Sequence, residues 1–414
     1  MSSRATGRGE QLVAGGWRLA TGPEWLERLL AGGVSQILRR IDAGMECGSI
    51  RATLPDGSQR VFGGRRPGFD ATVRLNSYRA LLRLATSGSV GCFQAWQRRE
   101  WESPDPVSLF ALFMANATSL GNVGRARGPW RWAMRVHHFL RRNTRAGSLR
   151  NIHAHYDLGN DFYAAWLDPT MAYSSARFAT GDTLEEAQRR KLASIAARLA
   201  GARDVLEIGC GWGAMARYLA DQGAQVTAIS LSDEQLAFAR AHHGHAAIEF
   251  RKQDYRDTQG QFDGIVSVEM VEAVGREYWP AFFDCIARNL KPGGRAAIQY
   301  IAMRDDLFAD YARSADFIQA YIFPGGLLVS EGEFRKLAQE RGLEWRDREG
   351  FGLDYAETLR QWRERFDRAV ADRRLPADFD EAFIDLWRYY LMYCEGGFRG
   401  GGIDVAQATL VKRA

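Results

Sequence analysis

The sequence predicts an α/β protein: a doubly wound, mostly parallel sheet with a helical insert, preceded by a smaller N-terminal α+β domain. Three observations favour this fold. Strand-like and helix-like segments alternate regularly from residue 203 to residue 301, and a glycine-rich turn at 209–213 follows an apolar run. The front third has neither feature. Because 414 residues exceed one small domain, we predict two domains, 1–145 and 146–414.

The N-terminal domain is expected to combine helices with short strands. Apolar side chains recur at helical spacing in 22–45, and 77–86 and 106–117 are also expected to be helical. Short strands around turns are expected between 50 and 75. This composition predicts a small α+β domain without a nucleotide motif.

The second domain is expected to contain the parallel sheet. Strands are predicted at 203–208, 224–230, 247–252, 262–268 and 294–301, and helices at 212–222, 232–243 and 277–289. A charged and aromatic insert at 303–325 then interrupts the alternation, and such an insert could cover a substrate pocket. Residues 355–396 are expected to be helical, and 403–412 to form a last strand.

Composition indicates a globular protein. Hydrophobic residues make up 46% of the chain, yet no apolar run approaches the ~20 residues that span a bilayer. The first eleven residues are polar and do not resemble a signal peptide, so we expect a cytoplasmic protein. Its five cysteines are scattered, and their spacing predicts neither a disulfide framework nor a metal site.

Positive charge is concentrated in one stretch. No acidic residue occurs between Asp105 and Asp157, and arginines recur there. An anionic partner is expected, either nucleic acid or an anionic membrane surface. Within the stretch, residues 129–142 interleave tryptophans and arginines, which suits a helix in a membrane interface. A helix that packs on its own domain explains the pattern equally well.

The glycine-rich turn predicts a cofactor site. Glycine at positions 209, 211 and 213 lets the backbone approach a ligand closely, with Cys210 between the first two. Glu207 lies inside the preceding strand, and an acid at this position suits a ligand that carries a free amino group.

Polar residues after the next two strands narrow the ligand further. Ser230 and Gln235 are placed to contact a ribose, and Asp254 with Tyr255 to contact an adenine. Because these residues follow successive βα units, we predict S-adenosylmethionine as the cofactor and a class I, Rossmann-like methyltransferase domain.

Several motifs then resemble one family. They are the segments 155–163, 171–176, 206–213, 253–257, 267–275, 321–326, 389–391 and 394–399. Together they are similar to the cyclopropane-fatty-acyl-phospholipid synthase family over residues 150–412. The front third resembles, more loosely, the extra N-terminal domain of the longer bacterial members.

The resemblance implies a reaction and a location. In that family, S-adenosylmethionine donates a methylene bridge to a cis double bond of a membrane phospholipid. We therefore expect a peripheral enzyme at the inner membrane face that acts on unsaturated acyl chains and not on nucleic acid. The sequence does not reveal the oligomeric state, and a homodimer stays one alternative.

The resemblance also assigns site residues. The family's cofactor contacts fall on Tyr173 and Ser174, besides the turn residues already described. Its active-site cysteine falls on Cys394, which we expect to line an ion site. Its bicarbonate-binding glutamate falls on Glu272, and its tyrosine near the ion on Tyr355. Bicarbonate is thus an expected second ligand.

Two departures from the family leave the outcome of the reaction open. Ser175 stands where a cysteine is frequent, and Gln299 where a histidine is frequent; a glutamine donates hydrogen bonds but does not titrate. Glu272 is then either the base or the holder of a bicarbonate base. The leading prediction is a cyclopropane fatty acid, and the alternative is a methyl-branched or methylene chain. A nucleic-acid methyltransferase ranks low, because 267–270 lacks the polar motif that base methylation needs.

Overall fold

The computed structural model describes residues 31–121 and 158–413, apart from residue 315. The arginine-rich segment 129–142 lies outside these ranges, as does the start of the helix expected at 22–45. The described residues form two compact units. The first contains 31–121 together with Asp306–Pro324 and Pro376–Gly402, and the second contains the remainder.

The first unit is a small α+β domain. Its sheet has the strand order β2-β1-β3-β4, built from β1 (Ser49–Thr53), β2 (Gln59–Gly63), β3 (Asp70–Leu75) and β4 (Trp101–Glu102). Its helices in the front third are α3 (Ala31–Gly44), α4 (Arg79–Gln97), α5 (Pro106–Ala115) and α6 (Ala117–Leu120). The strands and helices expected for this part of the chain are therefore confirmed where they are described.

Two segments from far along the chain complete this unit. They carry most of α14 (Asp305–Tyr311), the π-helical turn η4 (Ile318–Ile322) and all of α17 (Glu381–Arg399). The ring of Phe93 lies 5.0 Å from that of Phe317 and 5.0 Å from that of Tyr389, between centroids. Because large aromatic rings dominate the energetics of a core, these contacts explain why the first unit is assembled from three separate stretches.

The second unit is built on a doubly wound sheet. The strand order is β11-β12-β9-β8-β5-β6-β7, with β10 paired to β9. The strands are β5 (Asp204–Ile208), β6 (Gln225–Ser230), β7 (Ile248–Lys252), β8 (Phe262–Val268), β9 (Leu290–Met303), β10 (Val329–Ser330), β11 (Leu343–Gly350) and β12 (Ile403–Lys412). Strands β7, β6, β5, β8 and β9 are parallel, whereas β12 is antiparallel to both of its neighbours.

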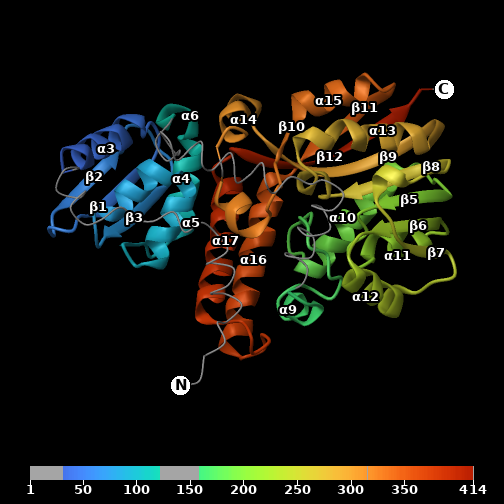
Figure 1. Ribbon diagram of the computed structural model, residues 1–414, viewed down its shortest axis with the longest axis horizontal. Coiled ribbons are helices and arrows are strands. Elements are labelled where there is room, and N and C mark those ends of the chain that lie inside the picture. Colours follow the sequence, from blue (N-terminus) through green and yellow to red (C-terminus); the bar gives the residue numbers. More distant parts are fainter. Residues whose placement is uncertain (1–30, 122–157, 315, 414) are drawn as a thin grey trace. The chain divides into compact units, whose positions relative to one another are not determined.

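Helices between the strands pack on this sheet, as Figure 1 shows for the green and yellow parts of the ribbon. They are α9 (Asn160–Ala164), α10 (Leu184–Arg198), α11 (Ala214–Asp221), α12 (Asp233–His243), α13 (Trp279–Asn289), α15 (Glu331–Gln339) and α16 (Gly352–Ala371), with the 3₁₀ turns η1 (Tyr255–Asp257), η2 (Val271–Ala273) and η3 (Arg276–Tyr278). The strands and helices expected between 203 and 301 are confirmed, as is the last strand.

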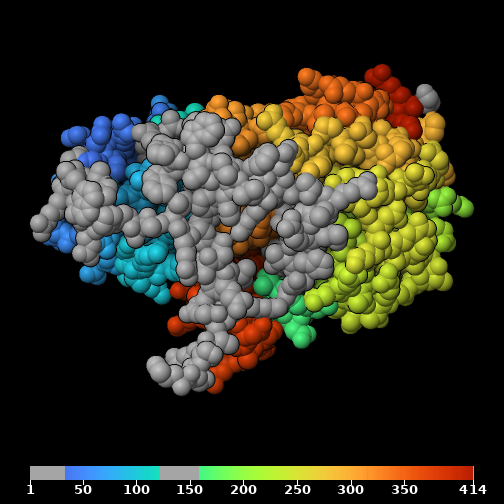
Figure 2. Space-filling view, viewed as in Figure 1, coloured from blue at the N-terminus to red at the C-terminus, as the bar shows by residue number. Residues whose placement is uncertain are grey.

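Local sequence explains where the helices nearest the site begin. Thr183 and Glu186 form a capping box that starts α10. The Ser232 hydroxyl caps α12, whose first turn is acidic and whose last turn is basic, as the helix dipole favours. Apolar side chains of α11, β5 and β6, including Leu219, Val205 and Val226, are buried together. In the space-filling view the segment from β6 to α13 forms one continuous yellow-green surface (Figure 2).

Within the described ranges, no helix is both long enough and apolar enough to cross a membrane.

Candidate active site

The candidate site lies at the carboxyl ends of neighbouring parallel strands in the second unit. Strand β5 is paired with β6 on one side and with β8 on the other. The strand order therefore reverses at β5, and ligands of doubly wound sheets bind where such a reversal occurs. Glu207 lies on β5, the glycine-rich turn follows it, and Glu269 and Glu272 follow β8.

The glycine-rich turn has a backbone that side chains disfavour. Gly209, Gly211 and Gly213 have φ values of 83°, 51° and 94°. The amides of Gly209 and Cys210 both donate to the carbonyl of Ile229, at 3.0 Å, which holds the turn against β6. Within the part of the chain that the structure describes, a Cβ at Gly211 would meet no atom within 4 Å other than those of its chain neighbours. The turn thus presents open backbone at the amino end of α11, where a polar ligand can approach.

Glu207 is a buried carboxylate beside this turn. It is 3% exposed, and burial raises the pKa of its carboxyl to about 8, although the Ala216 amide and Lys191 oppose this shift. Among the described residues, its Oε2 has no hydrogen-bond partner. An enclosed carboxylate oxygen of this kind can accept hydrogen bonds from a cationic ammonium group. Glu207 therefore fits the amino end of S-adenosylmethionine.

Tyr173 and Ser174 lie close to a buried lysine that the sequence did not single out. The Ser174 hydroxyl accepts a hydrogen bond from Nζ of Lys191 at 2.7 Å. Lys191 is 1% exposed, and burial lowers the pKa of its ammonium to about 8, opposed by the charges of Glu269, Asp168 and Glu207. The Tyr173 ring packs 5.2 Å from that of Trp362. Lys191 thus holds the side chain of Ser174, and Trp362 packs against the ring of Tyr173.

The residues predicted to contact the ribose and adenine lie where β6 and β7 end. The Ser230 hydroxyl donates to Oε1 of Gln235 at 3.4 Å. The amide nitrogen of Gln235 takes no part in this hydrogen bond. Burial raises the pKa of the Tyr255 hydroxyl. Asp254 differs from expectation, because its carboxylate forms an ion pair with Arg256 at 2.5 Å and caps η1. Part of its hydrogen-bonding capacity is thus used within the protein.

Glu269 forms the centre of a polar cluster. Its Oε1 accepts from the amide of Ser175 at 2.9 Å and from Nε2 of Gln299 at 2.7 Å. Its Oε2 accepts from the hydroxyl of Tyr355 at 2.8 Å. Burial raises the pKa of this carboxyl, and these three hydrogen bonds and the charge of Lys191 oppose the shift. Three donors arranged around one carboxylate stabilise its ionised form.

Glu272 has a different environment. Its Oε1 accepts a hydrogen bond from the amide of Ile301. Its Oε2 is enclosed and has no partner among the described residues. Burial, and next the charge of Glu269, raise the pKa of Glu272 to about 8. Two carboxyl groups with different surroundings can therefore hold different protonation states at neutral pH.

This arrangement does not fit a bicarbonate ion held as the sequence suggests. Gln299 and Tyr355, which were expected near the ion, direct their donors to Glu269 instead. The amide of Ser175 does the same. An anion added here would face the carboxylate of Glu269, with which these donors are already engaged, and this is electrostatically unfavourable. We therefore derive no step through bicarbonate.

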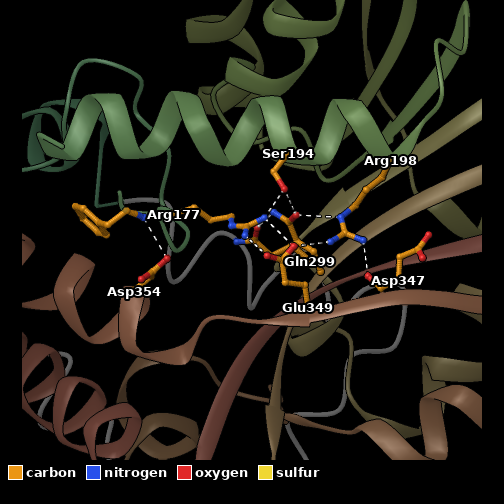
Figure 3. A network of polar contacts seen from close by, with 9 residues as sticks. Arg177, Ser194, Arg198, Gln299, Asp347, Glu349 and Asp354 are labelled. Atoms are coloured by element: carbon orange, nitrogen blue, oxygen red, sulfur yellow. Dashed lines mark hydrogen bonds and ion pairs between the residues drawn. The ribbon is translucent and has the colours of Figure 1, made fainter. Parts of the chain in front are cut away.

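A hydrogen-bond network sets the direction of one of these donors, the side-chain amide of Gln299 (Figure 3). Gln407 of β12 is the register partner of Gln299 of β9. Its Oε1 accepts from Nε of Arg198 at 3.1 Å and from the Ser194 hydroxyl at 2.7 Å, and its Nε2 donates to Oε1 of Gln299 at 3.0 Å. Because a guanidinium only donates, this sequence of contacts leaves Nε2 of Gln299 facing Glu269.

At one end of this network, two arginines form ion pairs with one exposed carboxylate. Glu349 forms ion pairs with Arg177 and with Arg198, the latter at 3.1 Å. A second donor of Arg198 reaches the carbonyl oxygen of Asp347 at 2.6 Å. The guanidinium of Arg198 is therefore fixed on both sides, which keeps the amide of Gln407 in one orientation.

Cys394 is the predicted site residue that belongs to the first unit, on α17. Burial raises the pKa of its thiol, and the charge of Asp316 adds to this shift. A thiol in such surroundings stays protonated and is a poor nucleophile. The expectation that Cys394 lines an ion site stays a prediction.

Sequence reasoning missed Glu269, Lys191 and Gln407. The signal for Glu269 was present, because an acidic residue directly after a buried parallel strand lies at the edge where ligands bind. The burial of Lys191 could not be predicted in this way, because a lysine within an amphipathic helix is ordinarily solvated. Gln407 could only be found from the pairing of β12 with β9.

The raised pKa of Glu272 predicts a dependence of stability on pH. The folded protein binds this proton more tightly than the unfolded chain, whose carboxyl has the ordinary value of 4.5. The stabilisation is complete below that value and is lost as pH rises toward about 8. Glu272→Gln lacks this loss, so its unfolding free energy relative to wild type should rise by about 2–3 kcal/mol from pH 5.5 to pH 7.5. Urea unfolding at both values measures it, and an unchanged difference would contradict the raised pKa.

Comparisons with known proteins identify the family of this chain. A family model described as mycolic acid cyclopropane synthetase matches residues 143–408. The chain is 40% identical over 357 residues to the cyclopropane-fatty-acyl-phospholipid synthase of Escherichia coli, covering 82% of this chain and 87% of that protein. It is 37% identical over 350 residues to the tuberculostearic acid methyltransferase UfaA1 of Mycobacterium tuberculosis, covering 80% of each.

Two solved structures of cyclopropane synthases are similar to this chain. The cyclopropane synthase MmaA2 from Mycobacterium tuberculosis matches with a TM-score of 0.58 and 29% identity, covering 64% of this chain and 98% of that one. The mycolic acid cyclopropane synthase CmaA1, in complex with SAH and CTAB, matches with a TM-score of 0.59 and the same identity and coverage.

Proposed function

Because the chain belongs to the mycolic acid cyclopropane synthetase family and is an S-adenosylmethionine-dependent methyltransferase that modifies acyl chains, we propose that it converts unsaturated acyl chains of membrane phospholipids into cyclopropane fatty acids. The observation that carries the proposal is the pair of carboxylates, Glu269 and Glu272, beside the glycine-rich turn. A proton acceptor close to the methyl donor is what ring closure requires.

The substrate explains the apolar surroundings of the site. An alkene is a weak nucleophile and attacks only where water is excluded and developing positive charge is stabilised. The ring of Trp362 lies between those of Tyr173 and Tyr355, tilted against the first at 5.2 Å and edge-on to the second at 6.1 Å between centroids. Aromatic faces attract cations through their quadrupole, so these rings suit a cationic carbon. When bound, S-adenosylmethionine supplies an electrophilic methyl group.

The predicted cofactor residues receive roles from their surroundings. Glu207 holds the ammonium group, and the backbone of Gly209, Gly211 and Gly213 admits the methionine part. Ser230 and Gln235 hold the ribose, while Tyr255 covers the adenine with Asp254 at its edge. Tyr173 and Ser174 close the site over the methyl donor.

The membrane surface is proposed as the place of action, on the inner face. A phospholipid acyl chain must leave the bilayer to reach the site, so a peripheral position is the simplest one. The arginine-rich stretch 129–142 supplies positive charge that anionic head groups attract. Vesicle pelleting with Arg131→Glu plus Arg135→Glu measures its contribution.

Lipid analysis after expression in a bacterium without its own synthase tests the function. Each modified chain should gain one methylene in mass, resist mild hydrogenation and be absent with an empty vector. Uptake of hydrogen would identify a methylene chain. Two further hydrogens in the mass of the modified chain would identify a saturated methyl branch. Unchanged lipids despite folded protein would contradict the proposed function.

A further inference from the structure

We propose that the side chain of Glu269 takes the place of a bicarbonate ion, so that this enzyme carries its own base and works without bicarbonate. The inference rests on the proposed function and deepens it. It follows from the three donors that converge on one carboxylate: the Ser175 amide, the Gln299 amide and the Tyr355 hydroxyl, at 2.9, 2.7 and 2.8 Å.

A carboxylate side chain presents the same acceptor group as bicarbonate. Each has two coplanar oxygens that share one negative charge. Each therefore accepts hydrogen bonds from donors that are arranged in the same way. Gln299 and Tyr355 are the residues that the family resemblance assigns to the neighbourhood of the ion. In this chain their polar hydrogens reach Glu269, whose backbone amide also donates to the carbonyl of Gln299 at 2.8 Å.

The network from Arg198 fixes Gln299 so that it presents a hydrogen-bond donor, and not an acceptor, to Glu269. Arg198 donates to Gln407, Gln407 donates to Gln299, and Gln299 donates to Glu269. Gln407 and Gln299 are 0% and 2% exposed. Reversal of either amide would place two carbonyl oxygens or two NH₂ groups against each other in a buried site, which costs free energy. Gln299 therefore presents a donor to Glu269 in every turnover.

The backbone at Glu269 indicates that the carboxylate is held there against a cost. Its φ is 48°, a left-handed conformation in which glycine is the unstrained residue. Such strain persists where surrounding contacts over-determine it, and it concentrates at functional sites. The three hydrogen bonds to the side chain are those contacts.

The chemical step balances with Glu269 as acceptor. The π electrons of the alkene form a bond to the methyl carbon, while the electron pair of the broken carbon–sulfur bond stays on sulfur. Glu269 accepts a proton from that methyl group, and the carbon–hydrogen electron pair forms the second carbon–carbon bond, which neutralises the cationic carbon. The proton leaves Glu269 for solvent after the product departs.

Glu269→Gly tests the proposal. Glycine suits the backbone, so this variant should fold, and it leaves a space lined by three donors. In buffer freed of carbon dioxide, wild type should turn over at its full rate and respond less than about twofold to added bicarbonate. Glu269→Gly should lose at least about 100-fold in kcat and recover at least about tenfold with bicarbonate. Glu269→Gln keeps the space filled and should not be rescued.

A binding measurement separates this test from activity. Bicarbonate should raise the thermal unfolding midpoint of Glu269→Gly and leave that of wild type unchanged, because only the variant has room for the ion. Wild type that needs bicarbonate, or a glycine variant that neither binds nor responds to it, would overturn the inference while the proposed function stands. Absence of any modified lipid with wild type would instead overturn the proposed function.

Discussion

Glu269→Gln is expected to lower kcat by at least about 100-fold, with little change in the affinity for S-adenosylhomocysteine. General-base catalysis contributes roughly 10²–10⁴-fold, and an amide cannot accept the proton. The substitution also disturbs the cluster, since the Ser175 amide, Gln299 and Tyr355 all donate to this side chain. A glutamine offers only one oxygen to these donors and adds an NH₂ group of its own.

Glu272→Gln serves as the matched comparison. Because the pKa of Glu272 is raised to about 8, its side chain is largely neutral at pH 7, and glutamine resembles that form. The expected loss in kcat is about tenfold or less, clearly smaller than that of Glu269→Gln. Release of S-adenosylhomocysteine gives kcat and KM for both variants, and calorimetry gives the affinity. A larger loss for Glu272→Gln would assign the base to Glu272, which is one of the two roles that the sequence left open for this residue.

The sheet could be predicted from the sequence because its signals are local. Buried strands such as Asp204–Ile208 and Phe262–Val268 are short apolar runs, and each is followed by a turn and a helix with recognisable caps. The glycine turn was equally visible. The backbone at 209, 211 and 213 is left-handed, a conformation that favours glycine. The three glycines therefore mark the turn in the sequence itself.

The make-up of the first unit could not be predicted in this way. The rings of Phe93, Phe317 and Tyr389 meet although more than 200 residues separate the first from the second. No local pattern encodes such a contact. The sequence predicted one domain over residues 146–414, and contacts among the described residues divide that stretch between the two units.

The polar cluster was half predictable. Gln299 and Tyr355 were identified by resemblance, and the structure brings both to one carboxylate. That carboxylate belongs to Glu269 and not to Glu272, which is three residues farther along. Which of the two acids accepts the hydrogen bonds of Gln299 and Tyr355 depends on two features. They are the positive φ at Glu269 and the contact of Gln407, on the last strand, with Gln299. Neither is visible in the order of residues alone.

Gly211→Ala is expected to raise the Kd for S-adenosylhomocysteine at least about tenfold, a change of roughly 1.4 kcal/mol. A Cβ at this position meets no atom of the described residues within 4 Å, so the added methyl group points into space that these residues leave open. We propose that the cofactor occupies this space. The methyl group should therefore disturb binding much more than folding.

Gly223→Ala is the control that isolates this effect. Gly223 also has a positive φ, 88°, and a Cβ there would also meet nothing within 4 Å, but it lies after α11, at the end remote from the turn. Both substitutions incur backbone strain of order 1 kcal/mol, which thermal unfolding measures. Only Gly211→Ala should weaken binding in calorimetry. Equal affinities in the two variants would mean that the cofactor does not approach the glycine turn, and the roles proposed for Glu207, Gly209 and Gly213 would fall with it.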